Sequence, residues 1–226
     1  MCGCADVQIC GCVDVRICRW ANVQICGCGD VQIFKKYTHI CIPHVRDIFA
    51  HPHIIMVTIK KVETDELDTL LNYSKKTFYE FFAHLNDPAH FEAYVAVAFA
   101  PEKMLSELVN PDSGFYFALA DGEIAGYIKL NINDTQNEFK EENGLEVERI
   151  YVSGEHHGKH IGRQLLNFAV ERGLALKKDF IWLGVWEHNH KALGFYQHHG
   201  FELCGSHDFM LGGDRQTDLL MRKCLN

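Results

Sequence analysis

The sequence predicts an α/β domain, and three observations point to this fold class. A strand pattern at 147–152 runs through a glycine-containing loop into a helix pattern at 164–170. An Asp-Gly pair at 121–122 separates two β-rich segments, which is typical of a hairpin. A strand pattern at 180–186 precedes a helix pattern at 189–199. Strands and helices that alternate in this way predict a central sheet flanked by helices.

The first half of this domain contains mostly helical patterns. Met56 opens a strand pattern that ends at Val62, and Thr64 begins a helix whose leucines and phenylalanines recur on one face. A second helical region covers about 88–110. Pro101 lies inside this region and is expected to split it, because proline fits the first turn of a new helix.

The second half contains mostly strands. Residues 115–120 and 123–131 form the two arms of the hairpin, and a polar loop follows at 133–144. Gly200 ends the last helix, after which strands at 201–210 and 215–223 flank a Gly-Gly turn. We expect the polar loop to connect the hairpin to the central strand.

The N-terminal segment is built from a different pattern. Four consecutive octads run from Cys2 to Ile33, beginning with Cys-Gly-Cys-Ala-Asp-Val-Gln-Ile, and hold seven of the ten cysteines. Thiolates at Cys-x-Cys spacing suit zinc or copper(I), so one hypothesis is a metal-binding module. The alternative is a translated tandem DNA repeat upstream of a start at Met56. We expect residues 1–55 to be a non-native or unstructured extension and residues 56–226 to be the domain.

The composition of the chain predicts where the protein is located and which partners it does not bind. No basic segment followed by an apolar run marks a secretory signal, and no apolar stretch approaches the ~20 residues that span a bilayer. After Met56 the cysteines are Cys204 and Cys224, which suits a reducing compartment, so we expect a cytoplasmic protein without membrane contact. Residues 56–226 carry 12 Lys and 5 Arg against 26 acidic side chains, a formal charge of −9, which disfavours nonspecific nucleic-acid binding.

The loop at 157–163 is a candidate anion site. The first turn of a helix leaves N–H groups free and carries partial positive charge. The loop lacks the Ser or Thr of a phosphate-binding loop and the three glycines of a dinucleotide fingerprint. It is similar to motif A of the GCN5-related N-acetyltransferases (GNAT), Gln/Arg-x-x-Gly-x-Gly/Ala, with His157, His160 and Gly162 at the three defining places. The two histidines depart from the motif.

A second motif strengthens this resemblance. The strand 181–187, Asn189, and a helix with Ala192, Phe195-Tyr196 and Gly200-Phe201 resemble motif B of the same family. The segments 145–152 and 181–187 and the tail at 213–221, with its Gln-Thr-Asp, resemble the PaiA group of bacterial spermidine/spermine N-acetyltransferases. The resemblance covers about 56–224 and implies the GNAT acyl-CoA N-acyltransferase fold, a mixed sheet whose splayed strands form an acetyl-CoA cleft.

The resemblance also implies where acetyl-coenzyme A binds. Its pantetheine arm would pair with one splayed strand, and its pyrophosphate would meet the loop and helix start. His160 adds a side chain where the cofactor approaches closely. The residues expected to contact the cofactor are Ile150, Tyr151, Val152, His157, Gly158, Lys159, His160, Ile161, Gly162, Arg163, Asn189 and Ala192.

The implied reaction is acetyl transfer from a thioester to a primary amine. Such an amine has a pKa near ~10.4 and must lose a proton before it attacks. Glu148 and Glu187 are the candidate bases, Tyr196 is the candidate acid, and no metal is required. A polyamine such as spermidine or spermine is the expected substrate. Other small amines, aminoglycosides, a protein N-terminus and a non-catalytic acetyl-CoA-binding regulator remain alternatives, and a homodimer is plausible for this family.

Overall fold

A computed structural model describes residues 56–225, and the structural statements below concern these residues. The octads and the hypothesis of a thiolate metal site lie outside them. The strands are β1 Val57–Lys61, β2 Ser113–Ala120, β3 Glu123–Ile132, β4 Gly144–Val152, β5 Phe180–Trp186, β6 Glu202–Leu211 and β7 Asp214–Cys224. The α-helices are α1 Leu67–Phe82, α2 Pro88–Ala98, α3 Pro101–Leu108, α4 Ile161–Ala175 and α5 His190–His198.

The strands form one seven-stranded mixed sheet. Their order is β1-β2-β3-β4-β5-β7-β6. Neighbouring strands run antiparallel, except that β4 and β5 run parallel. Parallel neighbours need a crossover connection, and α4 supplies it. The predicted fold class is confirmed, and the parallel pair lies inside the sheet.

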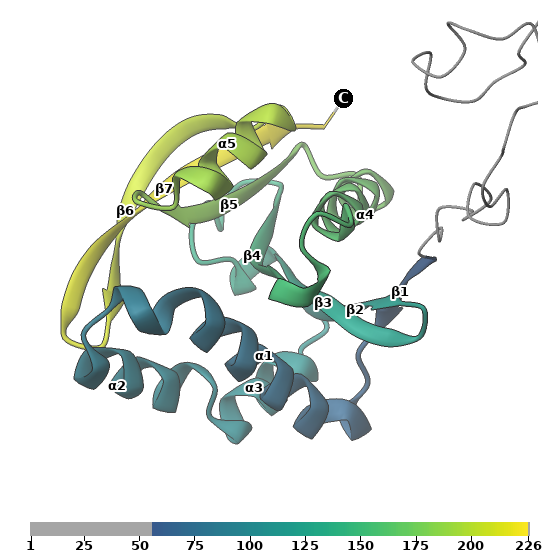
Figure 1. Ribbon diagram of the computed structural model, residues 1–226. Helices are drawn as coiled ribbons and strands as arrows, with labels where there is room; N and C mark the ends of the chain where they lie inside the picture. The colour runs from purple at the N-terminus through teal and green to yellow at the C-terminus, as the bar shows by residue number, and fades with distance from the viewer. Residues whose placement is uncertain (1–55, 226) are drawn as a thin grey trace, which may run out of the picture. The chain divides into compact units, whose positions relative to one another are not determined.

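Helices cover both faces of the sheet (Figure 1). On one face, α4 and α5 bury Leu165, Leu166 and Tyr196 against the strands. On the other face, α1, α2 and α3 enclose a second core that is rich in aromatic side chains and includes Phe78 and Phe91. Each face therefore has its own apolar core, and the sheet separates them.

The sequence explains where the three N-terminal helices begin. Glu63 and Glu66 form a capping box in a 3-10 turn at Thr64–Glu66, and α1 follows directly. Asp87 caps α2 by accepting hydrogen bonds from N–H groups in the first turn of that helix, and a proline occupies the same turn. Pro101 begins α3, so the predicted split of the second helical region is confirmed.

Tight turns close both hairpins. Asp121 and Gly122 have φ of 51° and 90°, the left-handed values that a two-residue hairpin turn requires. The β6–β7 turn contains Gly212 at φ 62°, and a Cβ there would clash with the backbone of His90 in α2. The N–H of Gly213 donates to Nδ1 of His90 at 3.0 Å. The second hairpin is therefore fastened to α2, on the α1–α3 side of the sheet.

The polar loop before β4 packs more tightly than its composition predicts. Gln136 is 1% exposed, and its Oε1 accepts a hydrogen bond from the indole Nε1 of Trp182 at 2.7 Å. Phe139 contacts the ring of Trp182 edge-on at 5.1 Å between centroids. The loop therefore covers the beginning of β5, and its polar residues satisfy buried partners.

Candidate active site

The predicted divergence of the two central strands is present. β4 and β5 pair at only three positions, Gly144 with Phe180, Leu145 with Ile181 and Glu146 with Trp182. From Val147 to Val152, β4 continues its pairing with β3 but has no described partner strand on its β5 side. Unpaired backbone groups at an edge can receive an extended ligand as an additional strand. We call the paired end closed and the diverging end open.

The open end faces the start of α4. His160 occupies the N-cap position with φ 60°, and no described side chain caps the helix. The first three N–H groups of α4, those of Ile161, Gly162 and Arg163, lack a described protein acceptor. Gly158 also has positive φ, 78°. His160 therefore adopts the left-handed conformation in which a glycine is usual, and the first turn can still receive an anion.

The basic side chains of this loop differ in their availability. Nε2 of His157 lies 2.9 Å from the carbonyl oxygen of Val152, and its ring packs near Phe81 at 5.6 Å between centroids. Lys159 and Arg163 are exposed and have no described ion-pair partner. The two permanent cations are thus free to meet a phosphate, whereas one nitrogen of His157 is occupied by the backbone.

Gly162 leaves open space at the end of β4. A Cβ at this position would come no closer than 3.8 Å to Phe195 and 3.9 Å to Val152, which is ordinary contact. The packing of the protein therefore does not require a glycine here. Together with the uncapped helix start and the unpaired edge of β4, this space fits a cofactor that lies along β4 and ends at α4.

A bulge in β4 directs two charged side chains to the α1–α3 face. Lys129 of β3 pairs with Arg149, but the next residue of β3 pairs with Val147, which leaves Glu148 without a pairing partner. The guanidinium of Arg149 lies 5.0 Å from the Phe99 ring centroid. A bulge places two consecutive side chains where one is usual. Glu148 and Arg149 consequently enter the same buried polar cluster.

Glu148 is held as a carboxylate by this cluster. Its Oε2 lies 2.5 Å from Nζ of Lys129 and accepts from Nδ2 of Asn131 at 2.6 Å. Its Oε1 lies 3.4 Å from Nε of Arg149. Burial opposes ionisation, but Arg149 and Lys129 more than offset it, so the pKa of Glu148 lies below its ordinary value.

Tyr196 projects from α5 into the core of the α4–α5 side. It is 8% exposed, and it packs against Phe195 and Phe201. Its hydroxyl has no hydrogen-bond partner among the described residues. Burial raises its pKa well above the usual value, so the phenol keeps its proton at neutral pH.

The residues after β5 have partners that the motif does not reveal. The N–H of Glu187 donates to the carbonyl of Thr217 at 3.1 Å, and its carboxylate is about half exposed. Oδ1 of Asn189 accepts from the N–H of Ala192 at 3.1 Å, so these two residues form the cap of α5. Glu187 and Glu148 therefore belong to different arms of the diverging pair, and the side chain of Glu187 is the more exposed, at 42% against 19% for Glu148.

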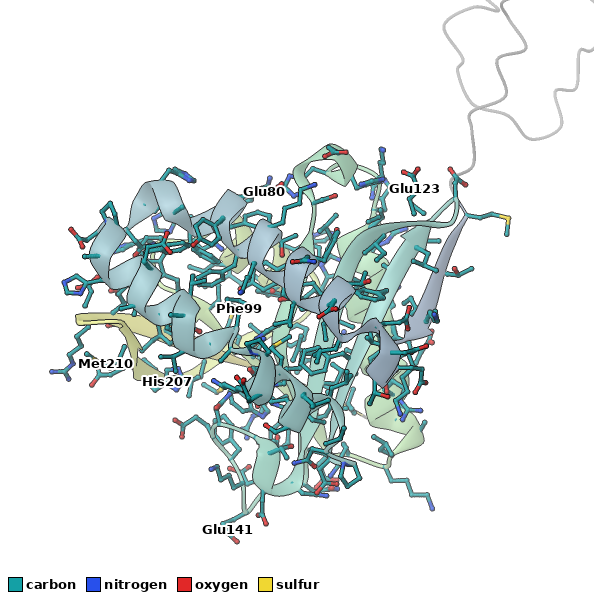
Figure 2. The ribbon with its side chains drawn as sticks, turned by 90° about the horizontal axis from the view of Figure 1, so that it is seen from below. Glu80, Phe99, Glu123, Glu141, His207 and Met210 are labelled. Carbon is teal, nitrogen blue, oxygen red and sulfur yellow. The ribbon has the colours of Figure 1, made fainter. Side chains whose placement is uncertain are left out.

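A second acidic group lies beside β5. Asp218 of β7 pairs with Trp186, the last residue of β5, and its Oδ2 lies 3.8 Å from Nε2 of His207. Nδ1 of His207 lies 3.0 Å from Oε1 of Glu138, in the polar loop. Burial raises the pKa of Asp218, and His207 opposes the rise. Figure 2 shows His207 from the side that α1–α3 cover.

Reasoning from the motifs missed the partners of Glu148. Lys129 and Asn131 alternate with apolar residues along β3, and Glu146 and Glu148 alternate with Val147 along β4. This alternation was a signal for a polar stripe on one face. It did not reveal Arg149, because a bulge cannot be read from alternation.

The described residues offer no second candidate site. Among residues 56–225, no helix is long and apolar enough to cross a membrane, and no group of His, Cys, Asp and Glu could hold a metal ion. Two open surface hollows lie away from the diverging strands. One lies between β1 and α4 and the other on β6–β7 near Cys204. Neither contains a predicted site residue.

Comparisons with known proteins agree with this geometry. The model of the acetyltransferase (GNAT) family matches residues 67–201. An uncharacterized N-acetyltransferase from the pepI 3′ region of Lactobacillus delbrueckii subsp. lactis is 41% identical over 169 residues, 75% of this chain and 98% of the relative. The spermine/spermidine N(1)-acetyltransferase of Bacillus subtilis is 25% identical over 97 residues, 42% of this chain and 62% of the relative.

A solved structure resembles the fold over nearly its whole length. The PaiA N-acetyltransferase of Thermoplasma acidophilum in complex with coenzyme A has a TM-score of 0.62 and 25% identity, covering 75% of this chain and 99% of that chain. The family is therefore supported both by sequence and by the arrangement of the strands.

Proposed function

The chain belongs to the acetyltransferase (GNAT) family and uses acetyl-coenzyme A, and from this premise we propose that it acetylates a primary amine of a polyamine such as spermidine or spermine. The observation that carries the acetyl-transfer part of this proposal is the divergence of β4 and β5 directly before the uncapped start of α4. This arrangement combines an extended binding edge with an anion site. An acyl donor that has both a pantetheine arm and a pyrophosphate needs both.

We assign the binding of acetyl-coenzyme A to the open end. Backbone groups of Ile150, Tyr151 and Val152 lie where β4 pairs with no described strand on its β5 side, although the Val152 carbonyl already contacts His157. The N–H groups of the α4 first turn suit the pyrophosphate, with Lys159 and Arg163 adding charge. The bound donor supplies an activated acetyl thioester. The chain's own task is to orient this group and to manage two protons.

Glu148 is the base that we favour. A carboxylate with a low pKa takes up a proton weakly, but it is always ionised and so attracts the substrate ammonium at neutral pH. Glu148 accepts the proton that the ammonium releases, directly or through water, and the free amine then attacks the thioester carbonyl. Glu187, which lies on the other arm and is about half exposed, is the alternative base.

Tyr196 is the acid in this proposal. As the carbon–sulfur bond breaks, negative charge develops on the departing sulfur. The Tyr196 hydroxyl donates its proton to that sulfur, and its raised pKa keeps the proton available until then. The nitrogen loses its second proton as the amide forms, and this proton restores the Tyr196 hydroxyl. Because this hydroxyl has no described protein partner, donation breaks no existing hydrogen bond.

A polyamine is favoured by the acidic groups on and beside the diverging strands. Glu148 on β4, Asp218 on β7 and Glu138 in the polar loop are three carboxylates, and His207 lies between the last two. Asp218 carries a raised pKa because it is buried, so a nearby cation would lower the free energy of its charged form. The similarity to a spermine/spermidine acetyltransferase adds support.

The test is thiol release from acetyl-coenzyme A by the full chain with a panel of amines. Spermidine and spermine are compared with a monoamine of similar length, an aminoglycoside and a peptide with a free N-terminus. We expect saturable release with the lowest KM for the polyamines. Release that favours another amine would show that this amine, not a polyamine, is the substrate. Cofactor binding without release for any amine would show that the protein is an acetyl-CoA-binding regulator and not an enzyme.

A further inference from the structure

One side chain joins two carboxylates in the buried polar cluster. Asn131 donates from Nδ2 to Oε2 of Glu146 at 3.0 Å and to Oε2 of Glu148 at 2.6 Å. Oγ of Ser113 donates to Oδ1 of Asn131 at 2.5 Å, which fixes the orientation of the carboxamide. The two acids are thus linked by one rigid donor, at the point where the closed end meets the open end.

The charges around the two carboxylates are distributed unequally. Lys129 from β3 and Arg149 from β4 both form ion pairs with Glu148, and they also face Glu107 from α3. Glu146 forms no ion pair with a described residue. Its remaining hydrogen bonds come from the N–H and Nδ2 of Asn137, at 3.0 and 2.7 Å. All the neighbouring cations therefore stabilise one member of the pair.

Glu146 consequently ionises in a different pH range from Glu148. It is 3% exposed, and β5 contributes only Trp182 opposite it, which brings no charge. Burial, with repulsion from Glu148 next, raises the pKa of Glu146 to about 7, while hydrogen bonds from Asn131 and Asn137 oppose the rise. Repulsion between two sites is mutual, so an ionised Glu146 also increases the proton affinity of Glu148.

We propose that Glu146 is a positioning residue that controls the basicity of Glu148 through the shared donor Asn131. The inference rests on the proposed role of Glu148 as base. When Glu146 is ionised, its negative charge offsets the two cations and makes Glu148 a stronger base. When Glu146 is protonated, it no longer offsets Lys129 and Arg149, Glu148 becomes a weaker base, and proton removal from the ammonium slows. The fall in kcat toward low pH therefore follows the protonation of Glu146.

The test compares kcat at each pH for the wild-type full chain and Glu146→Gln, with Glu142→Gln as the matched control. Glu142 precedes the same strand and forms an exposed ion pair with Arg222. Dividing the variant kcat by the wild-type kcat cancels ionisation of the substrate itself. We expect a ratio near 1 at pH 5.5, where Glu146 is protonated, falling to roughly 0.1 at pH 8.5. The control ratio stays near 1 throughout.

A constant ratio for Glu146→Gln, at any value, would overturn the inference, because a structural defect lowers kcat at every pH. A second measurement needs no turnover. Carboxyl ¹³C NMR titration follows Glu146 and Glu148, and the midpoint of Glu146 is expected to fall in Glu148→Gln, because the repulsion between the two carboxylates is lost. An unchanged midpoint would also overturn the inference. Coupled titration in a protein that acetylates no amine would instead refute the proposed function and, with it, the catalytic use of this pair.

Discussion

The two ends of the β4–β5 pair differ in almost every respect. At the closed end, the strands are hydrogen-bonded, Trp182 is 1% exposed, and Gln136 and Phe139 cover it. At the open end, the strands part and Trp186 is half-buried. The backbone of β4 pairs with no described strand on its β5 side there, so it can form hydrogen bonds with a ligand. One pair of strands therefore combines a packed end with a binding end.

This difference shows that one pair of strands can both stabilise the sheet and form a binding site. Rigid packing at the closed end fixes the angle at which the strands part. The open end can then keep unpaired backbone groups and an uncapped helix start, because it does not have to stabilise the sheet. Glu146 lies at the boundary and is buried like the closed end but titratable like a site residue. Four predictions separate the two ends, in order of expected effect.

The largest effect is expected at the closed end. Trp182→Ala removes a fully buried side chain and should lower the free energy of unfolding by about 3–5 kcal/mol. Trp186→Ala, the same change on the same strand at the open end, should cost about 1–2 kcal/mol because the ring is only half-buried. Urea denaturation of both variants measures the difference. Equal losses would show that the two ends do not differ in packing.

The boundary residue should make stability depend on pH. Because the pKa of Glu146 is raised to about 7, the native state keeps a proton that the unfolded chain releases, so wild-type stability falls as pH rises from about 4.5 to about 7. This loss is on the order of 3 kcal/mol, and Glu146→Gln lacks it.

The measurement is the free energy of unfolding of the wild type and Glu146→Gln across pH 4.5 to 8. The variant should gain relative to the wild type through that window and show no further relative change above it. Glu142→Gln, which alters an exposed carboxylate, serves as the control and should track the wild type. A pH-independent difference for Glu146→Gln would mean that the carboxyl does not titrate in this range.

At the open end, chemistry and stability should separate. Tyr196→Phe removes only a hydroxyl without a described partner, so the free energy of unfolding should change by less than about 1 kcal/mol. If this hydroxyl protonates the departing sulfur, kcat should fall about 10²-fold while the KM for acetyl-coenzyme A stays the same. Steady-state kinetics beside thermal denaturation checks both. An unchanged kcat would remove Tyr196 from the mechanism.

The smallest effect concerns the space at Gly162. Gly162→Val should weaken acetyl-coenzyme A binding by about tenfold, about 1.4 kcal/mol, by filling the opening at the end of β4. Gly194→Val is the matched control, because Gly194 is also helical and a Cβ there meets nothing within 4 Å. Calorimetric titration compares the two. Equal affinities would place the cofactor away from the start of α4.

The same contrast explains what the sequence could predict. The fold follows from local signals that agree with one another, such as Pro101 at the start of α3 and the Asp-Gly turn after β2. Motif A located the start of α4, although two histidines occupy defining places. His160 has the left-handed backbone conformation that favours glycine, so the backbone at this place is the one a glycine would suit although the residue is a histidine.

The electrostatics of the open end were less predictable. Glu148 was found by its position, but its ion pairs depend on a bulge that turns Arg149 to the same face. Asn189 and Ala192, expected at the cofactor, form a helix cap that serves folding by itself, and their contact with a cofactor stays a prediction. Lys129 lies far from Glu148 in the chain, so this ion pair could be predicted only if the register between β3 and β4 were known.

The central claim is that the open end binds the acyl donor while the closed end only holds the strands. Residue-resolved amide hydrogen exchange of the full chain, with and without saturating acetyl-coenzyme A, tests it most directly. We predict slower exchange at 150–152 and 158–163 when the cofactor binds, with no change at 144–146 or 180–182. Protection that is absent from 150–163, or equal at both ends of the pair, would contradict the account.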